Sequence, residues 1–170
     1  IRPTANPTLE GIPYEFGVCD SANELRDTIR RHNQARNKAR MVAGYCWDWR
    51  SRKDSTAMDV MVPEHGFGMQ WNLQDEASVW IIAPNSVAQI GCIHTCQGLE
   101  LDYVGVIIGD DLAVRNGRVV VDVSKRARAD RTVFGFQKFA REHPEEARRK
   151  AESIVKNTYR TLMTRGARGC

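Results

Sequence analysis

The sequence lacks an apolar run long enough to cross a membrane. Although 42% of its 170 residues are hydrophobic, no uninterrupted apolar stretch approaches the roughly 18 residues that a transmembrane helix needs. The N-terminal residues IRPTANPTLEG have neither the basic part nor the apolar part of a signal peptide. The composition therefore predicts one domain that buries its own core, with a cytoplasmic location and no membrane partner.

The sequence also lacks the paired cysteines of a zinc site. Its five cysteines are odd in number and scattered, and we interpret them as reduced thiols. Cys92, His94 and Cys96 alternate within one short segment, which supplies at most three metal ligands, and no distant pair completes the set. We therefore expect no metal ion in this domain.

Charge is unevenly distributed along the chain. Residues 1–114 hold 10 Lys and Arg against 15 Asp and Glu, whereas residues 115–170 hold 15 against 6. The two parts therefore carry about −5 and +9. Such asymmetry is typical of a face that binds nucleic acid or nucleotide phosphate, and solvated helix faces explain it equally well.

Short apolar segments alternate with a helical pattern in the first two thirds of the chain. A helix is predicted over residues 20–38, where Ser21 and Glu24 have capping-box spacing. Residues 60–78 are interpreted as an irregular loop because their glycines and aromatics show no period. Strands are predicted at residues 14–19, 39–46, 79–83, 91–95 and 102–108. Strands that are apolar on both faces predict a mainly parallel sheet covered by helices on both sides, which is a three-layer α/β domain.

The clearest helix is predicted from Pro144 to Arg165. Its apolar and small residues follow the 3.6-residue period, and Pro144 occupies a first-turn position. Gly166 follows its basic end. The chain stops shortly afterwards, where an α/β fold would enter another strand, so we interpret the sequence as a part of a longer protein.

A basic segment lies between the predicted sheet and this helix. Residues 118–122 predict a short strand or hairpin. Residues 124–131 follow with four basic side chains, close to Phe134 and Phe136. Basic residues beside aromatics are typical of a nucleic-acid surface. A solvated loop whose aromatics return to the core is the alternative, and the sequence favours it.

The segment IHTCQGLELDYVGVIIG, residues 93–109, combines a polar turn with an apolar strand. His94, Thr95 and Gln97 precede Gly98, and Glu100 follows it. A strand that ends in such a turn predicts that the turn lies at the C-terminal edge of a parallel sheet, where ligands of open α/β sheets bind. A histidine or a glycine alone would predict only a satisfied side chain or a tight bend.

Two motifs in this chain resemble those of superfamily 1 helicases. IHTCQGLELDYVGVII resembles motif V, in which His-x-x-x-Gly-Leu-Glu precedes an apolar strand. YRTLMTRGARG resembles motif VI, whose core is an aliphatic pair followed by Thr-Arg-Ala. Together with ARMVAGYCWDW and KNTYRTLMTRG, these segments resemble the Schlafen group 3-like family of DNA/RNA helicases over nearly the whole chain.

This resemblance implies the second RecA-like domain of a two-domain, ATP-driven helicase or translocase, a P-loop NTPase-type fold. In that family the Gly-x-x-x-x-Gly-Lys-[Ser/Thr] loop and the acidic magnesium site belong to the first domain, and this sequence contains neither. The implied cofactors, ATP and Mg²⁺, would be held mainly by that domain. The implied partners are the N-terminal RecA-like domain of the same protein and single-stranded DNA or RNA.

The resemblance also implies roles for individual residues. Arg165 matches the arginine finger that reaches the γ-phosphate, and Glu100 matches the motif V glutamate near the nucleotide. Gly98 allows close approach to the nucleotide. His94 and Thr95 match positions that face the single strand, where Gln97 replaces a frequent lysine.

Two departures from the family pattern accompany these matches. Gly166 stands where motif VI usually has alanine, a change expected to loosen the helix end. The motif IV arginine has no clear counterpart among Arg50, Arg52 and Lys53, and the role is left unassigned.

Two other functions fit parts of the sequence. A nucleic-acid binding module without ATP hydrolysis would explain the basic C-terminal part. A metal-dependent nuclease could use Asp102, Asp110 and Asp111, since carboxylates near strand ends gather magnesium. The nuclease interpretation lacks a general base at a defined spacing.

Overall fold

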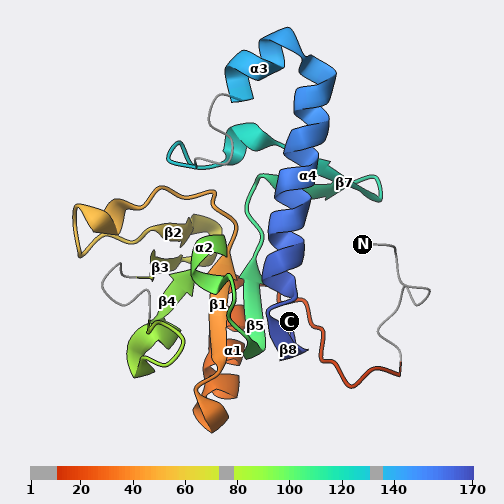
Figure 1. Cartoon of the computed structure of the whole chain (residues 1–170). Helices are drawn as coiled ribbons and strands as arrows, with labels where there is room; N and C mark the ends of the chain where they lie inside the picture. The colour runs from red at the N-terminus through yellow and green to blue at the C-terminus, as the bar shows by residue number, and fades with distance from the viewer. Residues whose placement is uncertain (1–10, 73–78, 131–135) are drawn as a thin grey trace.

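The computed structural model describes residues 11–72, 79–130 and 136–170 and contains a six-stranded sheet (Figure 1). Its strand order is β2-β3-β4-β1-β5-β8, and every neighbouring pair is parallel except β2 and β3. The strands are β1 (Ala39–Ala43), β2 (Val60–Val62), β3 (Phe67–Trp71), β4 (Gln89–Gly91), β5 (Leu101–Ile107) and β8 (Gly166–Gly169). The prediction of a mainly parallel sheet is confirmed.

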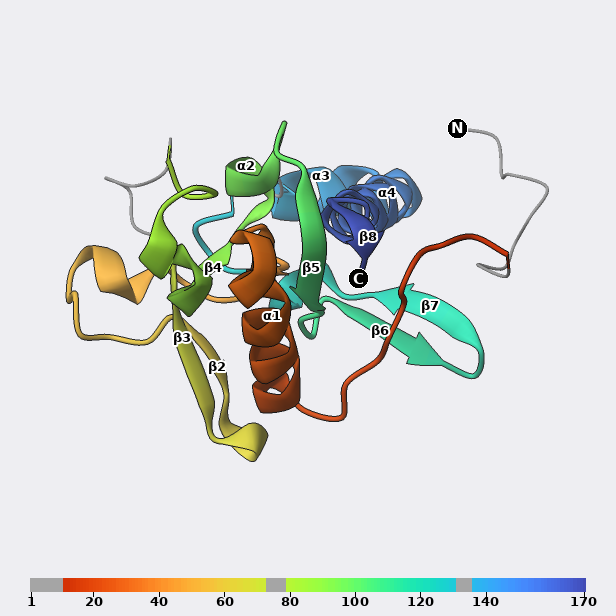
Figure 2. The same ribbon diagram turned by 90° about the horizontal axis from the view of Figure 1, so that it is seen from below.

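Helices cover both faces of this sheet. Helix α1 (Ala22–Arg36) packs on one face, and α4 (Pro144–Met163) lies on the other face with the short α2 (Ile93–Cys96), as Figure 2 shows. Helix α3 (Phe136–Glu142) packs beside α4. The predicted three-layer α/β arrangement is therefore confirmed.

Adjacent residues of β1 point into two separate cores. Met41 packs with Ile29 of α1, and Val42 packs with Val155 and Leu162 of α4, and all five side chains are buried. The alternation follows from the period of two in a strand. Burying a side chain of this size contributes about 1.5–3 kcal/mol, so a central strand with cores on both faces anchors both helix layers.

Helix α1 begins where the sequence predicts. The Ser21 hydroxyl accepts a hydrogen bond from the Glu24 backbone N–H at 3.1 Å, and the Glu24 carboxylate accepts one from the Asp20 N–H at 2.9 Å. At the other end Asn37 adopts a left-handed conformation with φ 52°. These caps satisfy backbone groups that a helix leaves unpaired.

A fully buried arginine ties α1 to the segment before β4. Arg40 in β1 donates hydrogen bonds to the Ser86 hydroxyl at 2.9 Å, the Asn33 side-chain oxygen at 2.6 Å and the Ile81 carbonyl at 2.8 Å. These acceptors are uncharged, and burial lowers the pKa of Arg40 to about 10. The hydrogen bonds offset part of the cost of burying the charge.

Two predicted strands are wrong. In residues 14–19 only Glu15 forms a β-bridge, to Gly169. The side chains of Phe16 and Val18 are exposed, so this segment does not form a buried strand of the sheet. Residues 79–82 form a turn, because the Ile82 and Ala83 N–H groups both donate to the Val79 carbonyl.

The segment interpreted as a loop contains two strands instead. Antiparallel β2 and β3 are joined by a short 3₁₀ turn, η2 (Pro63–His65). In β3 the side chains of Phe67, Met69 and Trp71 are buried and alternate with less buried ones. The predicted strand over residues 91–95 is also wrong in part, because β4 ends at Gly91 and α2 begins at Ile93.

The strand predicted over residues 118–122 is confirmed, and it is one half of a hairpin whose other strand precedes the predicted segment. Strands β6 (Leu112–Arg115) and β7 (Arg118–Val121) form a separate antiparallel pair. Further 3₁₀ turns are η1 (Arg50–Arg52), η4 (Pro84–Ala88) and η5 (Val123–Lys125). In the part of the chain that the structure describes, no helix combines the length and the apolarity needed to cross a membrane.

Candidate functional site

Glu100 and Arg165 lie side by side at one edge of the sheet. The Leu101 N–H donates a hydrogen bond to the Arg165 carbonyl at 2.9 Å. The next residue, Asp102, donates in the same way to the Lys38 carbonyl at 2.8 Å. Strands β1, β5 and β8 all start at this level, so we call it the N-terminal edge.

The Gly98 turn and the end of α4 therefore share an edge, but the C-terminal edge that the sequence predicts for the turn is wrong. The Gly98 turn leads into β5 rather than closing β4, because the one-turn helix α2 lies between the two strands. The turn and Glu100 consequently lie at the N-terminal edge, where parallel strands begin.

Arg165 keeps most of its hydrogen-bonding capacity unused. Helix α4 ends at Met163, two residues before the predicted end, and Thr164 caps it. The Arg165 Nε atom donates to the Thr161 carbonyl at 3.1 Å. Its two terminal nitrogens have no hydrogen-bond or ion-pair partner among the described residues, so they are available to an anion.

Gly166 has a steric reason to be glycine. A Cβ atom placed there would lie 2.1 Å from the Gly169 carbonyl oxygen and 3.1 Å from the Val104 backbone nitrogen. Gly166 begins β8 and does not belong to α4. The expected loosening of the helix end is therefore wrong, and the glycine instead allows β8 to approach β5.

Gly98 is required by its backbone conformation. Its φ is +81°, and a Cβ atom would meet no other atom within 4 Å. Residues with a side chain rarely adopt this conformation, which costs them about 1–2 kcal/mol. The Glu100 side chain beyond it is exposed, and no hydrogen bond or ion pair links it to the residues that the structure describes.

His94 and Thr95 lie toward the opposite edge. They belong to α2, which begins directly after β4, and the last residue of β4 is level with Val42 near the end of β1. His94 and Gln97 are both exposed. The Thr95 hydroxyl donates to the Asn72 side-chain oxygen at 2.6 Å, so its hydrogen is used within the domain.

The six residues singled out from the sequence are therefore divided between two edges. Glu100 and Arg165 are brought together. His94 and Thr95 lie past the C-terminal end of β4, and the chain between His94 and Glu100 returns along the α4 face to the start of β5. The segment that resembles motif V spans the sheet from one edge to the other.

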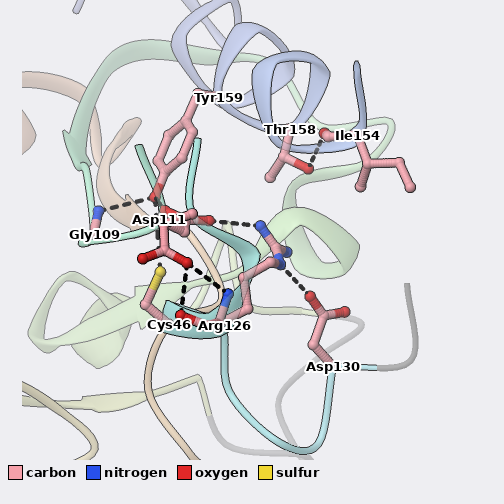
Figure 3. A network of polar contacts seen from close by, with 10 residues as sticks. Cys46, Gly109, Asp111, Arg126, Asp130, Ile154, Thr158 and Tyr159 are labelled. Atoms are coloured by element: carbon pink, nitrogen blue, oxygen red, sulfur yellow. Dashed lines mark hydrogen bonds and ion pairs between the residues drawn. The ribbon is translucent and has the colours of Figure 1, made fainter. Parts of the chain in front are cut away.

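A buried polar network occupies the C-terminal edge, as Figure 3 shows. The Tyr159 hydroxyl donates to one oxygen of Asp111 at 2.5 Å and accepts a hydrogen bond from the Gly109 N–H at 2.8 Å. Arg126 forms an ion pair with the other oxygen of Asp111 at 2.7 Å and a second pair with Asp130. The network joins α4, the end of β5 and the segment after the hairpin.

The environment of this network shifts several pKa values. Burial lowers the pKa of Arg126, but its hydrogen bond to Asp130 and the charges of Asp130 and Asp111 outweigh burial, so the net shift is upward. Burial, together with the charge of Asp111, raises the pKa of the Tyr159 hydroxyl and raises that of the Cys46 thiol to about 12. Arg126 therefore stays charged, and the phenol of Tyr159 and the thiol of Cys46 stay neutral.

The sequence does not predict this network. By sequence, Tyr159 is only one member of the apolar stripe of the helix, and Arg126 is only part of a basic segment. The spacing of Arg126 and Asp130, four residues apart, is the one local signal of their pairing. In that basic segment Lys125 and Arg128 are exposed, whereas Arg131 and Phe134 lie outside the described residues.

The carboxylates of the nuclease interpretation are not brought together. Asp102 lies at the start of β5, whereas Asp110 and Asp111 follow its end, and Asp111 is already paired with Arg126. Within residues 11–72, 79–130 and 136–170, no group of three or more His, Cys, Asp and Glu side chains could hold a metal ion. The geometry gives the nuclease interpretation no support.

The segment after β1 adds an aromatic and basic pair at the C-terminal edge. The Arg52 guanidinium carbon lies 4.1 Å from the centre of the Trp49 ring. Buried Asp59 holds this segment by accepting hydrogen bonds from the Ser51 and Trp71 N–H groups, each at 2.8 Å. The structure therefore places Arg50 and Arg52 at the C-terminal edge, whereas Arg165 lies at the N-terminal edge.

Comparison with known proteins gives a match over almost the entire chain. Residues 2–170 match the family described as Schlafen group 3, DNA/RNA helicase domain. The chain is 25% identical over 158 residues to a protein of Saccharomyces cerevisiae (strain ATCC 204508 / S288c) named Uncharacterized protein YPL245W. That match covers 92% of this chain and 33% of the yeast protein, so the chain spans about a third of that relative's length. No solved structure matches the chain.

Proposed function

Because the chain belongs to the Schlafen group 3 DNA/RNA helicase domain family, we propose that it is the second, RecA-like motor domain of an ATP-dependent helicase or translocase. The observation that carries this proposal is that Arg165 and Glu100 lie at one edge of the sheet. Among the described residues, neither the terminal nitrogens of Arg165 nor the carboxylate of Glu100 has a partner. An edge of this kind suits the nucleotide that a neighbouring domain would present.

In this proposal Arg165 acts as the arginine finger. A guanidinium placed against a transferring phosphoryl group stabilises the charge that develops there, and fingers supplied from another domain or protein contribute about 10³–10⁵ in rate. The alternative role, a cation that balances the end of a helix dipole, is worth about 0.3–1 kcal/mol. The two roles differ by several powers of ten in their effect on hydrolysis, so one variant separates them.

The rest of the nucleotide site belongs to a first domain of the same protein in this proposal. That domain would supply the phosphate loop and the carboxylates that hold Mg²⁺, which neutralises the phosphate charges. The matched region is 33% of the yeast relative, which leaves room for such a domain. Glu100 and Gly98 would then lie across the cleft, near the nucleotide.

The proposed nucleic-acid contacts lie toward the other edge. The side chains of His94 and Gln97 reach solvent and can bond a phosphate oxygen of a single strand. Thr95 contributes differently, because its hydroxyl hydrogen is held by Asn72 and fixes the orientation of α2. The positive charge of the C-terminal part of the chain supports a polyanionic partner.

The test uses the full-length protein and two substitutions. Arg165→Ala should lower the rate of ATP hydrolysis by about two or more powers of ten with little change in nucleic-acid affinity. His94→Ala should weaken single-strand binding and the stimulation of hydrolysis by nucleic acid, and should leave basal hydrolysis unchanged. Arg165→Lys should not restore the rate, because lysine lacks the planar fork that meets two phosphate oxygens.

Arg160→Ala is the matched control, since Arg160 is exposed on α4 one turn before the helix ends. It should hydrolyse ATP at the parental rate. Each variant should keep its melting temperature within about a few degrees, as surface substitutions usually do. A parental rate for Arg165→Ala would remove the motor assignment and leave a nucleic-acid binding module.

A further inference from the structure

The β6–β7 hairpin extends away from the body of the domain at the C-terminal edge (Figures 1 and 2). Asn116 and Gly117 connect its strands, with φ values of 50° and 72°. Two consecutive positive φ values define the tight turn that matches the twist of a hairpin. The tip is therefore a compact, preorganised structure rather than a long loop.

Two arginines face each other at this tip. Arg115 and Arg118 are directly paired residues of the two strands, and both are exposed. Neither forms an ion pair with a carboxylate in the described ranges. Like charges directly opposite each other destabilise a strand pair. An anion bound between them would remove that repulsion.

The base of the hairpin is fixed to the core. Leu112 and Val121 form its first residue pair and pack against the core under α4. Next to them the Asp122 N–H donates to the Asp111 carbonyl at 2.9 Å, and the Asp111 side chain belongs to the buried network with Tyr159. The position of the two arginines is therefore set by the core of the domain.

The surroundings of the hairpin are mainly positive. Lys125 and Arg128 are exposed just beyond it. The carboxylate of Asp122 is engaged by the hydroxyl and the backbone N–H of Ser124, at 2.6 Å and 3.0 Å. Asp110 is the exposed acidic residue on the other flank. The exposed cations outnumber these two acids, which favours an anionic partner.

We propose that the tip of the β6–β7 hairpin binds the phosphate backbone of nucleic acid through Arg115 and Arg118. The hairpin follows the end of β5, and His94, Trp49 and Arg52 also follow strands that end at this edge. The contact deepens the nucleic-acid half of the proposed function and depends on that half, but it is independent of Arg165 and ATP hydrolysis. Guanidinium groups suit phosphate because they donate two parallel hydrogen bonds.

The exposed pair Val114 and Val119, one step below the arginines, offers the competing possibility. An apolar pair could instead dock another part of the protein. Apolar docking on the two valines would leave the repulsion between Arg115 and Arg118 in place, whereas a bound phosphate would relieve it. The test therefore includes both pairs.

The experiment measures binding of the full-length protein to a fluorescein-labelled oligo(dT) and an oligo(rU) of about 30 nucleotides across about 50–200 mM KCl. Removing one phosphate neutralisation on a single strand reduces the slope of log affinity against log salt by about 0.7. The double variant Arg115→Ala, Arg118→Ala should bind more weakly at low salt, with a slope shallower by about 1.4 for the preferred strand. Replacing both arginines with lysine should retain most of the slope.

The matched control removes the same charge elsewhere. Arg30 and Arg31 are exposed on α1, on the other face of the sheet, and their double alanine variant should keep the parental slope. Val114→Ser with Val119→Ser should also keep it. Melting temperatures should stay near the parental value for all variants, because the substituted side chains are on the surface.

Four results would overturn the proposal. Equal slopes for the hairpin variant and the parent would show that the tip makes no phosphate contact, while the proposed motor would still stand on the Arg165 result. Equal reductions in the hairpin and α1 variants would show a general charge effect. A reduction confined to the valine variant would show an apolar docking role. A parent that binds neither oligonucleotide would overturn the nucleic-acid half of the proposed function as well.

Discussion

The two edges of the sheet hold their charged groups in different ways. At the N-terminal edge the guanidinium of Arg165 uses one nitrogen within the domain and leaves two without partners in the described chain. At the C-terminal edge Arg126 is buried and satisfied by two carboxylates. A buried, paired charge organises the fold, whereas an unpaired one that reaches solvent is ready for a ligand. The two arginines therefore differ in role although both lie in basic stretches of the sequence.

The edges also differ in where their free cations lie. At the N-terminal edge Arg165 lies against the body of the domain, next to the starts of β5 and β8. At the C-terminal edge the exposed arginines of the hairpin are held away from the body, beyond a buried anchor. The first arrangement suits a small ligand in a closing cleft, and the second suits an extended polymer.

The largest expected effect comes from a substitution that disrupts only the buried network at the C-terminal edge. Asp111→Ala leaves Arg126 as a buried charge with one partner fewer and removes the acceptor of the Tyr159 hydroxyl. Removing one member of a buried ion pair typically costs about 3–5 kcal/mol. Urea denaturation should show this decrease in the free energy of unfolding.

Asp110→Ala is the control for this prediction, because Asp110 is the exposed neighbour in sequence. It should change the free energy of unfolding by less than about 0.5 kcal/mol. Similar decreases in both variants would mean that the network does not anchor the C-terminal edge.

The second prediction compares the functions of the two edges by making the same substitution, glycine to alanine, at each of them. Gly98 and Gly117 both have positive φ and open space where a Cβ would stand. Replacing either with alanine should cost about 1–2 kcal/mol of folding stability. Gly98→Ala should also lower the rate of ATP hydrolysis by about tenfold, because the displaced turn carries Glu100. A tenfold change corresponds to about 1.4 kcal/mol of transition-state stabilisation.

Gly117→Ala should instead weaken single-strand binding and leave basal hydrolysis unchanged. Steady-state hydrolysis and oligonucleotide binding by the full-length variants distinguish the two outcomes. If both variants hydrolyse ATP equally slowly, the functional division between the edges is wrong.

The smallest expected effect concerns the segment that connects the edges. Cys96 belongs to this segment, its side chain lies in the core, and burial raises the pKa of its thiol from 9.0 to about 12. The unfolded chain releases this proton at lower pH than the folded one, so the thiol's contribution to stability is present below about pH 9 and is lost as pH rises further. The stability advantage of the parent over Cys96→Ala should therefore shrink by about 1 kcal/mol between about pH 8 and 10.

Chemical denaturation at several pH values measures this change. Cys19→Ala is the control, because the Cys19 side chain is only half-buried. Its stability difference from the parent should vary less with pH. A constant difference for Cys96→Ala would mean that the thiol is solvated and that the connecting segment opens readily.

Local patterns predict the elements whose own residues define them. Helix α1 has its capping residues in sequence, α4 has a regular apolar stripe, and β7 has a run of three valines. Strand β3 escapes prediction because Gly66 and Gly68 interrupt its alternation, although Phe67 and Trp71 are buried. Residues 79–83 have a strand-like composition, but Pro84 and the turn hydrogen bonds end the segment.

The site residues can be identified from sequence more easily than their arrangement. Glu100 and Arg165 can be paired because the resemblance assigns both of them to the nucleotide. Their edge cannot be deduced, since it depends on a short crossover from β4 to β5 that contains only one helical turn. The buried network is also beyond local patterns, because Tyr159 and Asp111 are 48 residues apart in the sequence.

The tight fit at Gly166 ties the evolution of this position to that of its neighbours. The carbonyl of Gly169 and the backbone beside Val104 occupy the space that a methyl group would need. A relative with alanine at the corresponding position must hold the strand equivalent to β8 farther from the one equivalent to β5, or shape the bend of that strand differently. Changes at 166 should therefore appear together with changes at 169 and 104 when lineages are compared. Gly166→Ala by itself should destabilise the domain, and a compensating substitution at position 104 or 169 should restore its stability.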